Sequence, residues 1–346
     1  MTERRDQSDT VAVLGAGSWG TALAVSLARK GIATRLWGRD PEQIVQMAQE
    51  RRNSRYLPQI EFPTALSVEA DIARAVADVS HVLLVVPSQG FRAALKLLEP
   101  HISTHTPVAW ATKGLEPHTF KLLHVLVREE LGTTRHTAVV SGPTFAREVA
   151  AGLPTAVTVA SFDAGFAHAF ARLLHSETFR AYTSTDVVGV EAGGAVKNVL
   201  AIAAGLADGM QLGANTRAAL ITRGLAEIQR LGVALGGHPE TLMGLAGLGD
   251  LVLTCTDNQS RNRRVGLGLA QGLTIAEIQQ DLGQVAEGIF TAQEVFNLAK
   301  QLGVDMPICG EVYEVLYCNK SARDALHSLL SRRLKPETGV SNSEPV

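Results

Sequence analysis

Residues 10–30 read TVAVLGAGSWGTALAVSLARK: a short apolar run, a glycine-rich turn and a longer apolar stretch. The first five residues, Thr10–Leu14, are the β-branched and aliphatic types that predict a strand covered on both faces. Thr21–Lys30 has leucines one helical turn apart and is followed by Gly31, a residue type that commonly ends a helix. The segment therefore predicts a strand, a tight turn and a helix at the start of an α/β domain.

The turn itself has the GxGxxG pattern of dinucleotide-binding folds, with Gly15, Gly17 and Gly20. In that pattern the glycines allow a tight turn, a close approach of backbone to pyrophosphate and close packing of helix on strand. The free N–H groups and the dipole of the helix N-terminus then favour an anion. A glycine-rich turn without a ligand is the alternative, and the position after the first strand favours a binding site.

Strand–helix alternation continues through the first half of the chain. Several strand candidates are continuous apolar runs, as in parallel strands covered by helices on both faces. Such alternation predicts an α/β domain with a Rossmann-type, doubly wound sheet. The further predicted strands are Ala33–Trp37, His81–Val86, Pro107–Ala111, Thr137–Ser141, Thr155–Ser161 and Phe179–Tyr182.

From about Val187, segments rich in Ala, Leu and Gly at helical spacing replace the β-branched runs. We expect residues 1–189 to form the NAD(P)-binding domain and residues 190–346 to form an all-α substrate and catalytic domain. The tail from about residue 333 is polar and is expected to be poorly ordered. The predicted helices are Val190–Leu206, Thr216–Leu231, Pro239–Leu245, Thr274–Leu282, Thr291–Leu302 and Gly310–Tyr317.

The composition excludes several classes of protein. The chain has 346 residues, of which 46% are hydrophobic and 19% charged, with a formal net charge of −2. This length favours two domains, the apolar fraction excludes a disordered chain, and the charge argues against nucleic acid as the main partner. We recognise neither a signal peptide in the polar N-terminus nor a membrane-spanning run of ~18 to 20 apolar residues. Cys255, Cys309 and Cys318 have no CxxC spacing and are expected to be reduced thiols in a cytoplasmic protein.

The end of the second predicted strand bears on the choice of coenzyme. An acidic residue there would favour NAD by bonding the ribose hydroxyls. Arg39 instead offers a planar donor for a 2′-phosphate or a face that stacks on adenine, and Asp40 precedes a proline and is placed to cap the next helix. We therefore expect NADP(H) to be preferred over NAD(H), with use of both left open.

The helical half contains three polar segments. Lys197 lies in the largely apolar segment EAGGAVKN (191–198), where burial would lower its pKa towards neutrality, as a general acid or base requires. A snorkelling surface lysine is the equal alternative. Asp250 follows a glycine-rich turn, and the N-cap of a helix is its simpler interpretation. The arginines of SRNRRVG (260–266) indicate either a solvated charged face or an anion site.

Two further polar segments follow predicted strands. Lys113 belongs to ATKGLE (111–116), which starts at the last residue of strand 107–111, and SGPTFA (141–146) starts at the last residue of strand 137–141. Ligands of open α/β sheets bind beyond the carboxyl ends of the strands. Position therefore favours a functional role for both segments, with an ordinary exposed loop lysine as the alternative for Lys113.

In combination, these motifs resemble the bacterial NAD(P)-dependent glycerol-3-phosphate dehydrogenases. The resemblance covers about residues 10 to 330, with the motifs in family order: GAGSWGTALA, ATKGLE, SGPTFA, EAGGAVKN, GLGDL, TCT, SRNRRVG and VAEG. It implies reversible hydride transfer between NAD(P)H and dihydroxyacetone phosphate, which gives sn-glycerol 3-phosphate for phospholipid head groups.

The resemblance also implies roles for individual residues. Lys197 would be catalytic, accepting the proton in alcohol oxidation and donating it in ketone reduction, and the Ser-Arg-Asn of SRNRRVG would bind the substrate phosphate. The residues expected to bind substrate are Lys113, Gly142, Thr144, Lys197, Asn198, Asp250, Thr254, Ser260, Arg261 and Asn262. The residues expected to bind the dinucleotide are Gly15, Gly17, Ser18, Trp19, Gly20, Arg39, Lys113, Ala146, Arg261, Val285 and Glu287.

Two alternatives stay open. A related two-domain dehydrogenase, of the ketopantoate reductase or 3-hydroxyacid dehydrogenase type, would not need the phosphate site. A non-catalytic dinucleotide sensor would need a DNA-binding unit or a basic face, which a net charge of −2 does not suggest.

The expected partner is a small phosphorylated substrate, with no metal, no nucleic acid and no membrane insertion. His101 and His105 have the spacing of one helical turn but lack a third ligand nearby, and they are expected at the surface. The Gly- and Ala-rich helical domain is compatible with a homodimer interface.

Overall fold

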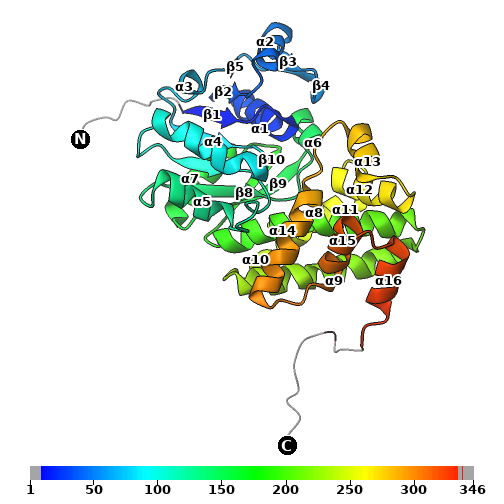
Figure 1. The fold of residues 1–346 in the computed structure, drawn as a ribbon. Coiled ribbons are helices and arrows are strands. Elements are labelled where there is room, and N and C mark those ends of the chain that lie inside the picture. The colour runs from blue at the N-terminus through cyan, green and yellow to red at the C-terminus, as the bar shows by residue number, and fades with distance from the viewer. Residues whose placement is uncertain (1–8, 334–336, 338–346) are drawn as a thin grey trace, which may run out of the picture.

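An eight-stranded sheet organises the first half of the molecule (Figure 1). The structure, a computed structural model, describes residues 9–333 and residue 337, so the polar N-terminus and the predicted disordered tail fall almost entirely outside the described residues. The strands of the sheet are β1 Thr10–Leu14, β2 Ala33–Trp37, β5 Leu66–Glu69, β6 His81–Leu84, β7 Val108–Trp110, β8 Thr137–Ser141, β9 Thr155–Ala160 and β10 Phe179–Ser184. They lie in the order β10-β9-β8-β7-β6-β1-β2-β5.

The sequence predicts seven of these eight strands, each end to within two residues. It misses β5 at the edge of the sheet, and also the small antiparallel pair of β3 (Arg52–Asn53) and β4 (Leu57–Glu61). These three segments are largely polar or half exposed, so they lack the apolar runs that identify the others.

Neighbouring strands run parallel except at one pair. The interpretation of every apolar run as a parallel strand is wrong for β9, which is antiparallel to β8 and parallel to β10. Val157 and Val159 of β9 pack into the core on one face of the sheet, and Ala160 packs into the core on the other. The apolar run therefore reflects cover on both faces, which does not fix the direction of a strand.

Helices cover both faces of the sheet. They are α1 Ser18–Arg29, α2 Pro41–Glu50, α3 Ile72–Ala75, α4 Phe91–Leu98, α5 Leu123–Leu131, α6 Ala146–Ala151 and α7 Ala164–Leu174, with 3₁₀ turns at Ser88–Gly90 and Glu99–His101. In β1, Val11 and Val13 pack with α1, α2 and α7, whereas Ala12 and Leu14 pack with α3, α4 and α5. Alternate residues thus enter two cores, which confirms the doubly wound α/β domain.

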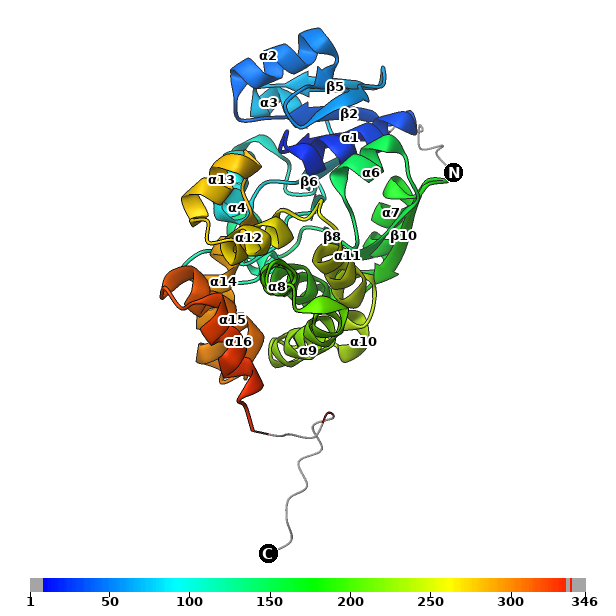
Figure 2. The ribbon, with the colours of Figure 1, turned by 90° about the vertical axis from the view of Figure 1, so that its right-hand side faces the viewer.

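Among the described residues after β10, the regular elements are all helices. Its centre is α8, Val187–Gly209, and α9, α11, α12 and α14 pack around it (Figure 2). The remaining helices are α9 Gly213–Ala234, α10 Pro239–Leu242, a π-helical turn Leu245–Gly249, α11 Asp250–Thr256, α12 Arg261–Ala270, α13 Ile275–Leu282, α14 Glu287–Leu302, α15 Pro307–Tyr317 and α16 Ala322–Leu330.

The backbones of α8 and α12 touch at two glycines. A Cβ on Gly205 of α8 would lie 2.0 Å from the carbonyl oxygen of Arg263, and a Cβ on Gly266 of α12 would lie 2.1 Å from the carbonyl oxygen of Ile202. No larger residue fits at either position without a shift of backbone. This contact fixes the start of α12, with its SRNRRVG segment, against the helix that carries Lys197.

By length and composition alone, α8 could cross a membrane, with a mean hydropathy of 1.5. The expectation that no run approaches a membrane span is therefore wrong for this helix. Within the protein, 94% of its apolar window is buried, so α8 is the core helix of the helical half.

The predicted domain boundary after residue 189 falls in the first turn of α8. There, Val187 and Val190 pack with residues of the sheet. The division into residues 1–189 and 190–346 stays a prediction.

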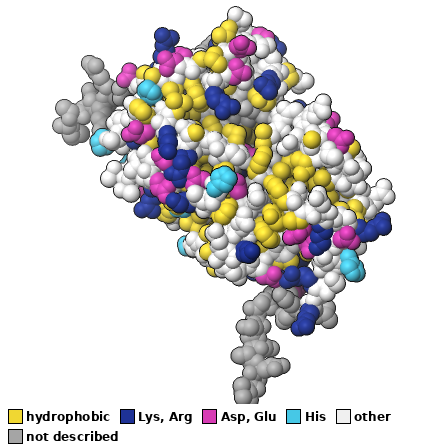
Figure 3. All heavy atoms as spheres, in the orientation of Figure 1, with side chains coloured by type: hydrophobic (Ala, Val, Ile, Leu, Met, Phe, Trp, Pro, Cys, Tyr) yellow, Lys and Arg dark blue, Asp and Glu magenta, His cyan; other side chains and the backbone are white. Residues whose placement is uncertain are grey.

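Charges of both signs are mixed on the surface. Figure 3 shows Lys and Arg side chains interspersed with Asp and Glu over one face of the molecule. That face presents no continuous basic area of the kind that binds a nucleic-acid backbone.

Candidate active site

The GxGxxG turn joins β1 to α1 at the carboxyl edge of the sheet. Gly15 has a φ of +127°, and a Cβ there would lie 2.3 Å from the carbonyl oxygen of Val85. A Cβ on Gly20 would lie 1.9 Å from the carbonyl oxygen of Gly15, whereas one on Gly17 would meet no described atom within 4 Å. Packing of the turn therefore requires Gly15 and Gly20, and Gly17 faces open space.

The start of α1 is suited to an anion. Its N-cap residue is Gly17, which has no side chain to accept a hydrogen bond from the first N–H groups of the helix. The first turn contains no acidic residue. Trp19 Nε1, which is buried, also lacks a hydrogen-bond partner within the described chain. Uncommitted donors beside an open glycine are what the pyrophosphate of a dinucleotide requires. These residues therefore fit the cofactor that the fold implies.

Arg39 and Asp40, two and three residues after the end of β2, have the different environments that the sequence predicts. Asp40 caps α2, because its Oδ1 accepts hydrogen bonds from the backbone N–H groups of Glu42 at 3.1 Å and Gln43 at 3.3 Å. This carboxylate is therefore committed to the helix. Arg39 is exposed at the end of the strand that neighbours β1.

Two lysines from different halves of the molecule meet on one carboxylate. Lys113, in the loop after β7, donates to Asp250 Oδ2 at 2.6 Å and to the carbonyl oxygen of Gly142 at 3.1 Å. Lys197, in the middle of α8, donates to Asp250 Oδ1 at 2.6 Å and to Thr254 Oγ1 at 3.0 Å. Because β7 and β8 are neighbours, their carboxyl ends bring Lys113 and Gly142 together. The structure thus joins five predicted site residues in one centre.

Asp250 is the first residue of α11, directly after the π-helical turn. The N-cap interpretation of Asp250 is wrong, because Gly249 occupies the N-cap position. Asp250 is fully buried, and each of its oxygens bonds a lysine. One turn later, Thr254 Oγ1 donates to the carbonyl oxygen of Asp250 at 2.6 Å, which directs its hydroxyl oxygen to Lys197.

Burial sets the electrostatics of the centre. The side chains of Lys197 and Lys113 are 9% and 13% exposed, so a snorkelling Lys197 and an exposed Lys113 are both wrong. Burial lowers the pKa of Lys197 to about 8; the charge of Asp250 opposes the shift, and the charge of Lys113 adds to it. At neutral pH the ammonium is the major form, and it gives up its proton far more readily than an ordinary lysine.

A second polar chain connects α8, α12 and α14. Asn262 Nδ2 donates to Asn198 Oδ1 at 2.9 Å, and the backbone N–H of Gly288 donates to Asn262 Oδ1 at 2.9 Å. Asn198 directly follows Lys197, so this chain ties the starts of α12 and α14 to the lysine centre. The sequence does not indicate these two contacts of Asn262.

The arginines of SRNRRVG have different environments. Ser260 caps α12 by accepting a hydrogen bond from the backbone N–H of Arg263 at 3.2 Å. Arg263 is buried and ion-paired with Asp208 at 2.5 Å, a contact that the sequence does not predict. Arg261 and Arg264 are exposed, so a solvated charged face describes only part of the segment. Arg261 is exposed, directly precedes Asn262, and donates a hydrogen bond to Gln284 Oε1 at 3.3 Å.

The segment after β8 lies against the same centre. Thr144 Oγ1 donates at 3.2 Å to the carbonyl oxygen of Gly142, which also accepts from Lys113. Gly142 has a φ of +153°, and a Cβ there would lie 3.0 Å from the carbonyl oxygen of Ala156. Thr144 and Ala146 are half-buried.

The start of α14 closes the site from the other side. Val285 is exposed and Glu287 is half-buried. Burial raises the pKa of Glu287, and the positive charges of Arg261, Lys197 and Lys113 oppose the shift. The carboxyl of Glu287 is therefore within electrostatic range of the lysine centre.

Sequence reasoning misses a group of buried polar residues behind the centre: Ser88, Thr291 and Glu294. Each has a side-chain oxygen without a hydrogen-bond partner among the described residues. The signal that could have found two of them is the spacing of Glu287, Thr291 and Glu294, which places three polar residues on one face of a helix.

No group of three or more His, Cys, Asp or Glu side chains within residues 9–333 is arranged to hold a metal ion. His101 and His105 are both exposed.

Comparison with known proteins covers both halves of the chain. The N-terminal model of the NAD-dependent glycerol-3-phosphate dehydrogenases matches residues 10–167, and the C-terminal model matches residues 186–327. The chain is 58% identical over 325 residues to the glycerol-3-phosphate dehydrogenase (NAD(P)+) of Nitrosococcus oceani, with 94% of each chain covered.

Solved structures show the same similarity. The crystal structure of glycerol-3-phosphate dehydrogenase from Coxiella burnetii is 48% identical, with a TM-score of 0.91 over 94% of this chain and 99% of that one. The glycerol-3-phosphate dehydrogenase of Saccharomyces cerevisiae is 28% identical, with a TM-score of 0.80 over 93% of this chain and 99% of that one.

Proposed function

The chain belongs to the family of NAD-dependent glycerol-3-phosphate dehydrogenases, and we propose that the reaction takes place at Lys113, Asp250 and Lys197. The enzyme is an NAD(P)-dependent oxidoreductase that reversibly reduces dihydroxyacetone phosphate to sn-glycerol 3-phosphate for glycerophospholipid synthesis. Family membership at this identity overturns the two alternatives, a ketopantoate reductase-like enzyme and a non-catalytic sensor. The observation that supports the site is the buried Asp250 carboxylate, shared by two lysines beyond the strand ends.

For the cofactor we assign the GxGxxG turn and the residues around it. Ser18 and Trp19 would hold the pyrophosphate with the N–H groups of α1, and Arg39 would hold the adenosine end. The residues assigned to the nicotinamide end are Lys113, Ala146, Arg261, Val285 and Glu287. When bound, the reduced nicotinamide supplies a hydride to the ketone carbon of the substrate. A preference for NADP(H) over NAD(H) follows from the exposed Arg39 and from the commitment of Asp40 to α2.

Lys197 handles the proton in this proposal. Reduction of the ketone develops negative charge on the substrate oxygen, and the Lys197 ammonium donates a hydrogen bond and then a proton to it. In alcohol oxidation the neutral amine accepts that proton. Asp250 and Thr254 hold Nζ in place, and a pKa of about 8 makes both forms accessible near neutral pH. Lys113 adds a second positive charge beside the substrate.

The substrate phosphate is assigned to the start of α12. Ser260, Arg261 and Asn262 form its N-terminal end, where the helix dipole and free N–H groups favour an anion. The exposed guanidinium of Arg261 is suited to a bidentate contact with phosphate oxygens. Gly142 and Thr144 would line the substrate from the sheet side. Binding the phosphate away from the reacting carbon positions the carbonyl for transfer.

We also propose that the enzyme is a cytoplasmic homodimer built from domains of residues 1–189 and 190–346. Cys255 and Cys309 are buried free thiols, which suits a reducing compartment. The Gly- and Ala-rich helical half supports close contact between two copies.

The substrate assignment is tested by following NADPH oxidation with dihydroxyacetone phosphate, unphosphorylated dihydroxyacetone and ketopantoate, with NADH in parallel. We expect turnover that depends on the phosphate group. Arg261→Ala should raise the KM for dihydroxyacetone phosphate by about tenfold to a hundredfold, and should change the rate with dihydroxyacetone much less, through the assigned place of Arg261 at the nicotinamide end. Equal effects on the phosphorylated and unphosphorylated ketones would remove Arg261 from the phosphate site.

The catalytic assignment is tested by Lys197→Ala. We expect kcat to fall by roughly 10²- to 10⁴-fold, because the proton donor is lost. Binding of NADPH, followed by its fluorescence, should survive, since Lys197 holds the substrate side. A variant that keeps its kcat would show that another group transfers the proton.

A further inference from the structure

The glycine-rich turn between β1 and α1 is anchored by side chains from other parts of the sequence. The carbonyl oxygen of Ala16, in the middle of the GAG segment, accepts a hydrogen bond from Asn53 Nδ2 at 3.0 Å and another from Gln43 Nε2 at 3.2 Å. Asn53 belongs to β3, which the sequence does not predict, and Gln43 lies in the first turn of α2. Two amide groups from two elements therefore hold one peptide of the turn.

Asn53 also reaches the far side of the turn. Its Nδ2 donates to Thr21 Oγ1 at 2.8 Å, in the first turn of α1, and both residues are fully buried. A carbonyl oxygen can only accept a hydrogen bond, so the Nδ2 side of this amide must face Ala16. One amide group thus spans the turn, from the residue before Gly17 to the start of the helix.

The acceptor side of the same amide is left unused. Asn53 Oδ1 is buried and has no hydrogen-bond partner within the described chain. An unpaired buried acceptor destabilises a fold. The contribution of this amide therefore lies in its donor, which faces Ala16 and Thr21.

The rest of the backbone around Ala16 is fixed as well. Ala16 is buried, and a Cβ on Gly38, directly after β2, would lie 2.8 Å from the Cβ of Ala16. The N–H of Gly15 donates to the carbonyl oxygen of Trp37 at 2.9 Å. The chain up to the Ala16 carbonyl is thus set by β2, α2 and β3 together.

The planar peptide bond passes this anchor on to the next residue. The peptide between Ala16 and Gly17 is trans, and in a trans peptide the C=O and the following N–H point in opposite directions. Holding the carbonyl of Ala16 towards Asn53 and Gln43 therefore turns the N–H of Gly17 away from them. A Cβ on Gly17 would meet no described atom within 4 Å. A fixed donor at an uncrowded glycine is what the binding of pyrophosphate requires.

We propose that Asn53 and Gln43 are positioning residues for the coenzyme, which hold the Ala16 carbonyl and thereby aim the N–H of Gly17 at the pyrophosphate. They act through the turn and not by contact with the reacting atoms. The inference rests on the proposed assignment of the glycine-rich turn to the dinucleotide. Because NADPH and NADH share the pyrophosphate, both coenzymes should depend on this anchor equally.

The test compares Asn53→Leu, Asn53→Ala and Gln43→Ala with a matched control, Arg135→Met. Leucine has the branched shape of asparagine without its donor, so Asn53→Leu separates the hydrogen bonds from the packing. Arg135 is also a buried residue of the sheet half, and it donates to the backbone carbonyls of Ser103 and Thr106, ahead of β7 and away from the turn. Binding of NADPH and NADH to the full-length enzyme is followed by fluorescence, and KM, kcat and thermal stability are measured alongside.

We expect each Asn53 variant to weaken the binding of both coenzymes by about tenfold, since the buried donor to Ala16 is lost. Gln43→Ala leaves Asn53 in place and should weaken both by about threefold. The ratio of the two dissociation constants should not change. At saturating NADPH, kcat and the KM for dihydroxyacetone phosphate should stay within about twofold of the native values. Arg135→Met should lose thermal stability and keep its affinity for both coenzymes.

An Asn53 variant that loses only stability, as Arg135→Met does, overturns the inference and leaves the proposed function intact. A loss of affinity confined to one of the two coenzymes does the same, because it places the effect away from the pyrophosphate. If the Asn53 variants do not fold, Gln43→Ala decides, and native affinity in that variant overturns the inference.

Gly17→Val tests the turn itself. Its side chain would start in open space within the protein and would stand where the pyrophosphate is assigned, so this variant should lose most of its affinity for both coenzymes. Native affinity in Gly17→Val would remove the turn from the coenzyme site, which overturns that part of the proposed function together with the inference.

Discussion

The single carboxylate of Asp250 accepts hydrogen bonds from two lysines, so the three groups together carry a net positive charge when both lysines are protonated. A buried ammonium is costly unless it is paired or used in chemistry. Here the attraction of Asp250 for Lys197 is weakened by the like charge of Lys113, so burial prevails and the pKa of Lys197 falls to about 8. The positive charge left over suits a substrate that brings a phosphate and develops an alkoxide.

The pKa of Lys197 predicts opposite pH dependence for the two directions of the reaction. Ketone reduction needs the ammonium, so its rate should fall as pH rises through about 8. Alcohol oxidation needs the neutral amine, so its rate should rise over the same range. Initial rates in both directions across this range check the prediction. Rates that change in the same direction with pH would contradict it.

Arg39 predicts a change of coenzyme preference. On its proposed role, Arg39→Asp would replace a donor for the 2′-phosphate by a carboxylate that repels the phosphate and can bond the ribose hydroxyls. The ratio of kcat/KM for NADPH to that for NADH should fall by about tenfold or more. Arg180→Asp makes the same charge change on β10, at the opposite edge of the sheet from β5, and should leave the ratio unchanged. Equal ratios in Arg39→Asp and the native enzyme would remove Arg39 from the coenzyme site.

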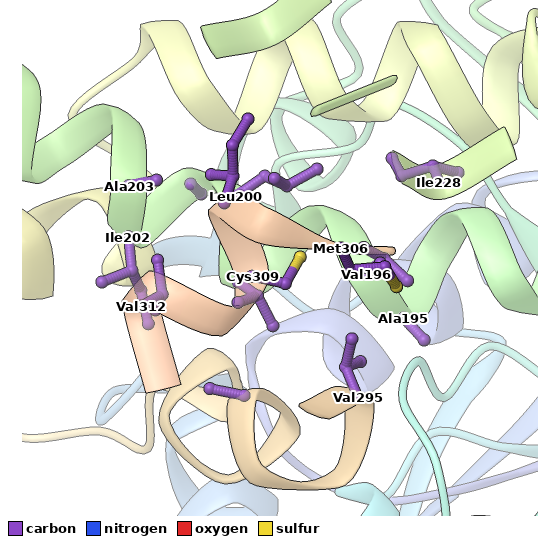
Figure 4. Packing of buried hydrophobic residues seen from close by; sticks show 14 of the residues in the cluster. Ala195, Val196, Leu200, Ile202, Ala203, Ile228, Val295, Met306, Cys309 and Val312 are labelled. Carbon is purple, nitrogen blue, oxygen red and sulfur yellow. The ribbon is translucent and has the colours of Figure 1, made fainter. Parts of the chain in front are cut away.

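At the scale of elements, α8 and α12 act as one unit. Figure 4 shows part of the apolar core around α8, to which Val196, Ile228, Val295 and Met306 contribute. The glycine contacts of α12 fix its N-terminus at a set distance from Lys197. The distance between the proposed phosphate site and the proton donor is therefore set by backbone packing.

Gly205→Ala should disturb that packing. Its Cβ would lie 2.0 Å from the carbonyl oxygen of Arg263, so α12 must move, at a cost of about 1–3 kcal/mol in the free energy of unfolding. Gly310→Ala on α15 is the matched control, because its Cβ would meet no described atom within 4 Å and alanine favours helix. Urea unfolding of both variants checks this. Similar loss of stability in the two would contradict the role of the α8–α12 contact.

The sequence predicts elements well where residues repeat with a clear period, as in β1 and α8. It fails at Asp250, because local sequence shows a polar residue near a helix start and does not show the two lysines, 137 and 53 residues away, that bind it. The sequence leaves the burial of Lys197 open for the same reason, since its partners Asp250 and Thr254 come from α11, more than 50 residues away. Arg263 and Asp208, 55 residues apart, form an ion pair that no local pattern indicates. The residue types of the site can therefore be predicted from the sequence, whereas the contacts between these residues depend on the fold.

At the scale of the whole molecule, the two halves should unfold together. Val187 and Val190 of α8 pack with the sheet, while the rest of the helix forms the core of the helical half. The three tryptophans, Trp19, Trp37 and Trp110, all lie in the sheet half, and most helices lie in the other. Tryptophan fluorescence and far-ultraviolet circular dichroism should therefore report one shared transition. Two separate midpoints would show that the halves fold independently.

The burial of α8 also has a consequence for how this enzyme changes over generations. Twenty of its 23 residues are buried, so the helix has no solvent-facing stripe on which neutral substitutions can accumulate. Arg39, by contrast, is exposed on a short connection. On the proposed roles of Arg39 and Lys197, coenzyme preference is therefore expected to change far more readily over generations than the helix that carries the proton donor.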